Sequence, residues 1–96
     1  MPSLQEIRSQ REAILACARE HGASAVRIFG SVSRGEEKEG SDVDFLVQFD
    51  DTRTLLDHSG LIIDLTDLLG TKVDVLSDEG ISPYIREQVL SEAVPL

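Results

Sequence analysis

The spacing of apolar residues along the chain predicts three helices. Apolar side chains recur at helical spacing over 4–21 and 54–69, which places them on one face of a helix. Gly22 and Gly70 directly follow these two segments, and glycine is common just past a helix end. A third helix is predicted over 82–93, because this segment opens with serine and proline, residues preferred at the N-cap and in the first turn.

Three shorter segments, 25–30, 43–49 and 72–76, are predicted to be strands. Over 43–49, valine and phenylalanine occupy every second position, so the segment has one apolar face. A single helical turn is predicted at 32–34, between the first two strands, and a charged loop at 36–41.

The predicted element order is α-β-α-β-α-β-α, which is an α/β arrangement. The helix over 54–69 is long enough to connect two parallel strands, whereas the connection between the first two strands is irregular. We therefore expect one domain spanning 1–96, with a small twisted mixed sheet flanked by helices.

Composition narrows the possible partners and compartments. The 96 residues include 18 Asp and Glu against 9 Lys and Arg, for a net charge of −9, which disfavours direct nucleic-acid binding. Such a surface suits a basic protein partner or simply keeps the protein soluble. One cysteine excludes an internal disulfide, and neither a membrane span nor a signal peptide is evident. We expect a cytoplasmic protein that does not bind membranes.

The candidate chemistry begins where the first strand ends, at the segment Gly30-Ser31-Val32-Ser33-Arg34-Gly35. Gly30 permits a sharp turn and close approach of a phosphate to the backbone, and Ser31 adds a hydroxyl. The following amides and the guanidinium of Arg34 would complete an anion cradle. The alternative is a tight strand-to-helix turn with an arginine that faces solvent.

Two carboxylates, Asp42 and Asp44, follow at the start of the second strand. Two residues apart in a strand, they leave the same face, separated by roughly 6.5 to 7 Å along the backbone. Such a pair suits Mg²⁺ in two-metal phosphoryl transfer. The alternative is that Ser41-Asp42 is a turn entering the strand and Asp44 an ordinary solvent-facing carboxylate.

The ordered set formed by these residues resembles the signature of the DNA polymerase β superfamily of nucleotidyltransferases. That signature is Gly-Ser-x-x-x-Gly, then Asp-x-Asp, then a third acidic residue on a later strand, a position matched here by Asp74. The chain is most similar to the minimal nucleotidyltransferases, the antitoxin halves of bacterial and archaeal HEPN/MNT toxin–antitoxin pairs. The resemblance extends through 68–75 and 81–94, and implies the polymerase β-like nucleotidyltransferase fold.

The resemblance implies a role for each motif residue. Asp42 and Asp44 would bind two Mg²⁺ ions, and Asp74 would bind the catalytic ion and orient or deprotonate the attacking hydroxyl. Gly30, Ser31 and Arg34 would hold the β and γ phosphates of ATP. The expected reaction is transfer of AMP to a tyrosine hydroxyl of a cognate HEPN ribonuclease toxin, with which the chain would form a hetero-oligomer.

The sequence leaves two other functions open. The chain could be a binding antitoxin that masks its toxin without catalysis, an interpretation that its acidic surface and small size favour. It could also transfer a nucleotide to a small molecule, although no segment here supplies an acceptor-binding domain.

Overall fold

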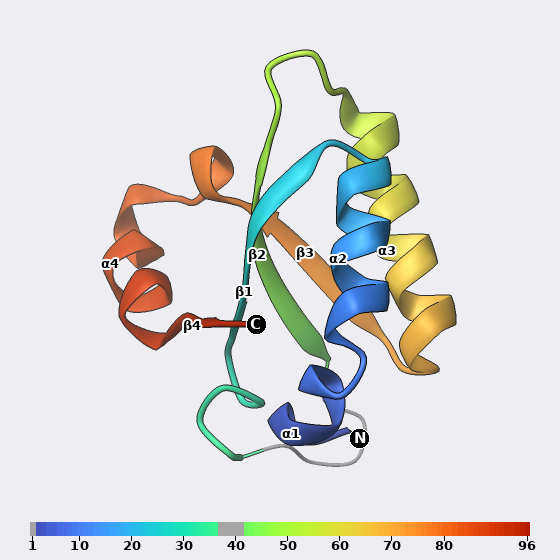
Figure 1. Ribbon diagram of the computed structural model, residues 1–96. Helices are drawn as coiled ribbons and strands as arrows, with labels where there is room; N and C mark the ends of the chain where they lie inside the picture. Colours follow the sequence, from blue (N-terminus) through green and yellow to red (C-terminus); the bar gives the residue numbers. More distant parts are fainter. Residues whose placement is uncertain (1, 37–41) are drawn as a thin grey trace.

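The protein is described by a computed structural model that places residues 2–36 and 42–96. Its centre is a four-stranded sheet of order β3-β2-β1-β4 (Figure 1). β2 pairs in parallel with β3, whereas β1 pairs antiparallel with both β2 and β4. The strands are β1 (Ala23–Phe29), β2 (Val43–Phe49), β3 (Val73–Ser77) and β4 (Val94–Pro95). The sheet is therefore mixed, as the element pattern predicts.

Helices cover both faces of this sheet. They are α1 (Leu4–Arg8), α2 (Arg11–Glu20), α3 (Leu55–Leu69), the 3₁₀ turn η1 (Asp78–Gly80) and α4 (Pro83–Glu92). α2 and α3 lie on one side of the sheet and α4 on the other (Figure 1). None of the helices in the described part of the chain is long and apolar enough to cross a membrane.

The alternation over 43–49 sends side chains to two different packing clusters. Val43, Phe45 and Val47 are buried in the larger cluster, which contains Ile14 of α2 and Leu61 of α3. The smaller cluster lies on the α4 side of the sheet. It consists of Leu46, Ile81 and Val89, with Phe29, Leu76, Leu90 and Ala93 packed against it. One face of the sheet is thus a full hydrophobic core, and the other is apolar only where α4 covers it.

The predicted fold class is confirmed, with a few local differences. The helix predicted over 4–21 is two helices, because the Ser9 hydroxyl donates to the Glu6 carbonyl and the amide of Gln10 bonds to Ile7 rather than Glu6. The helical turn predicted at 32–34 is a hydrogen-bonded turn outside any helix. β4, two residues long, was not predicted. Of the loop predicted at 36–41, only Glu36 lies within the described residues, so Ser41 lies outside them.

The start of α3 is fixed by a capping box. The Thr54 hydroxyl accepts from the amide of Leu56 at 3.2 Å, and the Thr54 amide donates to the Asp57 carboxylate at 3.3 Å. Replacing Thr54 by Ala is expected to lower the free energy of unfolding by about 1 kcal/mol, measured by urea denaturation. Thr52→Ala, an exposed threonine two residues earlier, is the matched control. Equal unfolding midpoints for the two variants would contradict the assigned cap.

Candidate active site

Three aspartates meet at one end of the sheet face that α4 partly covers. Asp44 of β2 and Asp74 of β3 are register partners in the parallel ladder, so their backbones are about 4.8 Å apart. Asp42 lies two residues before Asp44, immediately ahead of the strand. Val73 and Val75 are buried on the opposite face, which leaves Asp74 on the exposed side, as the alternation predicts. The register therefore gathers carboxylates that are separated by 30 positions in sequence.

The surroundings of Asp44 disfavour its charged form. Burial raises its pKa, and the negative charges of Asp74 and Asp42 raise it further, to about 6. The positive charge of Arg34 acts in the opposite direction and lowers the pKa of Asp44. Asp42 has a partner in Lys72, 3.8 Å away, but the mutual repulsion at Asp44 still leaves a site that is suited to a bound cation.

The turn after β1, which begins at Gly30, packs against the side chain of Asp44. Gly30 has φ +78°, and a Cβ atom at this position would overlap the Oδ2 atom of Asp44. Only glycine tolerates both the positive φ and the close approach of Asp44 without strain. Because Phe29 is the register partner of Asp44, the end of β1 brings this turn beside the carboxylates.

Hydrogen bonds within the turn leave its first amides available. The Ser31 carbonyl accepts from the amides of Arg34 at 3.2 Å and Glu36 at 2.8 Å, and the Ser33 hydroxyl donates to the Gly30 carbonyl at 2.7 Å. Val32 is buried in the main core and anchors the turn. Among the described residues, none accepts a hydrogen bond from the amides of Ser31, Val32 or Ser33. Consecutive free amides of this kind bind anions.

Arg34 lies between the turn and α4. Its Nε atom is 3.1 Å from Oε2 of Glu36, and its Nη1 atom is 2.9 Å from Oε2 of Glu92, the last residue of α4. The hydrogen bond to Glu36 and the nearby Glu92 raise the pKa of Arg34 above its ordinary value. The arginine therefore stays charged beside the carboxylate cluster.

The donor set fits Mg²⁺ in chemical type. Mg²⁺ prefers a few carboxylate oxygens together with waters and phosphates, and Asp42, Asp44 and Asp74 present such oxygens on one face. Within 2–36 and 42–96, however, no three His, Cys, Asp or Glu side chains are grouped closely enough to hold an ion. Binding of one ion by all three carboxylates would therefore require these side chains to move closer together.

Comparisons with known proteins decide the family. The family model for the nucleotidyltransferase domain matches residues 11–96. The chain belongs to this family. Protein adenylyltransferase MntA of Thermococcus cleftensis is 40% identical over 95 residues, which cover 98% of this chain and 96% of that protein. The predicted membership of the nucleotidyltransferases is therefore confirmed.

Solved structures agree with this family assignment. A structure proposed to be a minimal nucleotidyltransferase has 53% identity and a TM-score of 0.88, covering 99% of this chain and 97% of its own. A chain in the complex of tri-AMPylated Shewanella oneidensis HEPN toxin with MNT antitoxin has 21% identity and a TM-score of 0.70. That match covers 92% of this chain and 69% of the other, and at this identity it concerns the fold alone.

For this nucleotidyltransferase chain, the structure brings together all six residues that the motifs single out. Asp42, Asp44 and Asp74 share one end of a sheet face, and the turn carrying Gly30, Ser31 and Arg34 borders it. Sequence reasoning missed Glu92, which approaches Arg34 from 58 positions away. No local pattern distinguishes Glu92 from Glu87, the other acidic residue of α4, so only the tertiary structure reveals it.

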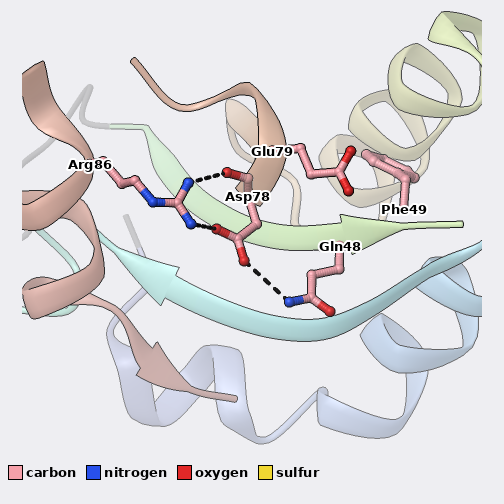
Figure 2. A pocket seen from close by; sticks show the side chains of 5 residues that line it. All are labelled: Gln48, Phe49, Asp78, Glu79 and Arg86. Atoms are coloured by element: carbon pink, nitrogen blue, oxygen red, sulfur yellow. Dashed lines mark hydrogen bonds and ion pairs between the residues drawn. The ribbon is translucent and has the colours of Figure 1, made fainter. Parts of the chain in front are cut away.

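A second polar cluster lies at the opposite end of the same sheet face, around a pocket of about 250 Å³ (Figure 2). The Asp78 carboxylate is 3.2 Å from Nη2 of Arg86 and accepts a hydrogen bond from Nε2 of Gln48 at 3.2 Å. Arg27 of β1 lies 3.7 Å from the same carboxylate. These contacts join η1 and α4 to the sheet. The Asp78 charge is thereby compensated by two arginines within 4 Å.

Proposed function

We propose that this chain is a Mg²⁺-dependent protein adenylyltransferase that transfers AMP from ATP to a tyrosine hydroxyl of a cognate HEPN toxin. The observation that carries the proposal is the pairing of Asp44 with Asp74, with the Gly30 turn packed directly against Asp44. Family membership and the MntA relative support it. ATP as donor favours a cytoplasmic location, and the partner toxin would make the working assembly a hetero-oligomer.

Each residue has a chemical task in this proposal. The free amides after Gly30, the Ser31 hydroxyl and the Arg34 guanidinium would bind the β and γ phosphates. Asp42 and Asp44 would hold two Mg²⁺ ions, with Asp74 contributing to one of them. When bound, the ions neutralise the charge that develops on the phosphates and on the attacking and leaving oxygens.

Asp74 is the residue suited to meet the acceptor, because its side chain is exposed whereas Asp44 is half-buried. Its carboxylate would orient the tyrosine hydroxyl and take its proton as the oxygen bonds to the α-phosphorus. The bond from that phosphorus to the bridging oxygen of pyrophosphate breaks in the same displacement, and pyrophosphate leaves. Most of the rate enhancement would come from orientation and charge stabilisation.

The test is label transfer from α-labelled ATP to the purified toxin in the presence of Mg²⁺. We expect label on a toxin tyrosine with the unmodified chain, and a loss of at least about a hundredfold in rate with Asp74→Asn. Asp67→Asn, an exposed aspartate of α3, is the matched control and is expected to retain full activity. An unlabelled toxin, or equal rates for the two variants, would refute the proposal.

A binding antitoxin is the second candidate, and a specific surface feature favours it. Leu55 and Leu56, at the start of α3, are 82% and 83% exposed, and exposed apolar side chains of this size are typical of protein contacts. Masking without catalysis predicts that Asp74→Asn still protects cells from the toxin. Loss of protection by a variant that still binds the toxin would eliminate this candidate.

A further inference from the structure

Arg34 has two carboxylate partners that differ in their surroundings. Glu36 is 62% exposed, whereas Glu92 is only 22% exposed. Because solvent readily replaces an exposed partner, the Glu36 contact is easily exchanged for a phosphate. The Glu92 contact is harder to break, since a poorly solvated carboxylate that loses its cation is costly to leave unpaired.

The last residues of the chain fix the position of Glu92. The amide of Ala93 bonds to the Val89 carbonyl at 3.0 Å and closes α4. Val94 and Pro95 then pair with Ile28 and Arg27 of β1, the strand that leads into the Gly30 turn. Arg8 donates to the Pro95 carbonyl at 2.7 Å and secures this pairing from α1. Glu92 is therefore held by the same strand that positions the phosphate-binding turn.

The guanidinium retains donors when Glu92 is bound. The Arg34 Nη1 atom contacts Glu92 and its Nε atom contacts Glu36. Among the described residues, none accepts a hydrogen bond from the Nη2 atom of Arg34. Arginine has five N–H donors in a rigid fork, so one edge can be held by a protein carboxylate while others meet phosphate oxygens. The same positive charge also acts on Asp44, so Arg34 already contributes to the electrostatics of the carboxylate cluster.

We propose that Glu92 is a positioning residue for nucleotide binding, holding the Arg34 guanidinium by Nη1 so that its remaining donors are aimed at the triphosphate. This inference rests on the proposed function, because it takes Arg34 to be a phosphate ligand. It adds a residue of α4 to a donor site otherwise built from the sheet and the turn. Preorganisation of this kind strengthens ligand binding by reducing the ordering that binding requires.

The experiment measures binding of Mg²⁺–AMP-PNP by calorimetry, with no toxin present. Glu92→Gln keeps the size of the side chain and removes its charge, and is expected to weaken nucleotide affinity about five- to tenfold. Glu87→Gln, an exposed glutamate of the same helix, is the matched control and should bind as the unmodified chain does. Circular dichroism on each variant establishes that the fold is retained.

A double-mutant cycle separates positioning from a general effect on the fold. If Glu92 acts through Arg34, then Glu92→Gln introduced into an Arg34→Ala protein should change affinity less than twofold. An equal loss in both backgrounds would overturn the inference, as would unchanged or tighter binding by Glu92→Gln alone. Complete absence of nucleotide binding by the unmodified chain would instead overturn the proposed function together with the inference. If Glu92→Gln labels the toxin as fast as the unmodified chain does, and binds nucleotide with the same affinity, the inference is overturned while the proposed function stands.

Discussion

Replacing Asp44 by asparagine is expected to abolish nucleotidyl transfer and, at the same time, to make the protein more stable. The rate should fall at least about a thousandfold, because the substitution removes a central metal-binding charge from a site that works mainly by electrostatic stabilisation. Toxin labelling with α-labelled ATP measures this loss. Retention of more than a tenth of the rate would contradict the role assigned to Asp44.

The stability gain follows from the pKa of Asp44, which burial and its two acidic neighbours raise from an ordinary value of 3.8 to about 6. A carboxyl with a raised pKa binds its proton more tightly in the folded state, so stability falls as pH rises from 3.8 to about 6, and the full cost of the charge is present above pH 6. Partial solvation reduces this cost, and we expect Asp44→Asn to gain about 1 to 2 kcal/mol at pH 7.5.

The pH dependence provides the control for this prediction. As pH falls from 7.5 to 5, Asp44 becomes protonated in the folded chain, so the stability difference between the unmodified chain and Asp44→Asn should shrink. Asp67→Asn, which removes one exposed carboxylate without touching the cluster, should not show this convergence. Urea denaturation at the two pH values measures all three proteins in the absence of Mg²⁺ and nucleotide. If the difference in stability between the unmodified chain and Asp44→Asn were the same at both pH values, Asp44 would not be the group with the raised pKa.

Substitution of Gly30 by alanine is expected to damage both stability and activity. The residue has φ +78°, and its new methyl group would overlap Oδ2 of Asp44. Strain in the left-handed region and displacement of the neighbouring carboxyl together should cost about 2 to 4 kcal/mol. For a domain of this size the melting temperature should then fall by about 10 °C or more, measured by calorimetry.

Gly35 is the matched control for this substitution. It has nearly the same backbone angle, φ +70°, but a methyl group there would meet no atom of residues 2–36 or 42–96 within 4 Å. Gly35→Ala should therefore show only the conformational cost, about 1 kcal/mol. Adding Asp44→Ala to the Gly30→Ala protein removes the overlapping atoms and should restore part of the lost stability. Equal melting temperatures for the two glycine variants would show that contact with Asp44 is unimportant.

Local patterns were sufficient to predict the residues of the candidate site but not all of the elements that hold them. The alternation of Val73, Asp74 and Val75 was enough to place Asp74 on an exposed face, because side-chain direction in a strand depends on parity alone. The pairing of Asp74 with Asp44 depends on the parallel register, which the chain specifies only through its tertiary packing.

The features that sequence reasoning missed are those in which local propensity competes with distant contacts. The hydroxyl of Ser9 ends α1 early, although Ile7 and Ile14 on either side of it are two helical turns apart and would lie on one face of a continuous helix. β4 has only two residues, too few for any periodicity, and it forms because β1 offers a free edge. The role of Glu92 depends on that same pairing, so no window around Arg34 could have revealed it.

α4 covers only part of one face of the sheet, and this affects how the acceptor specificity of related chains could change. The middle of that face is buried in the cluster of Leu46, Ile81 and Val89, while Asp74 at its end is exposed. On the proposed function, an acceptor protein that approaches there would be selected by the fit between the two protein surfaces. Acceptor choice could then change through substitutions on outer helices, while the residues proposed to bind the triphosphate stay the same.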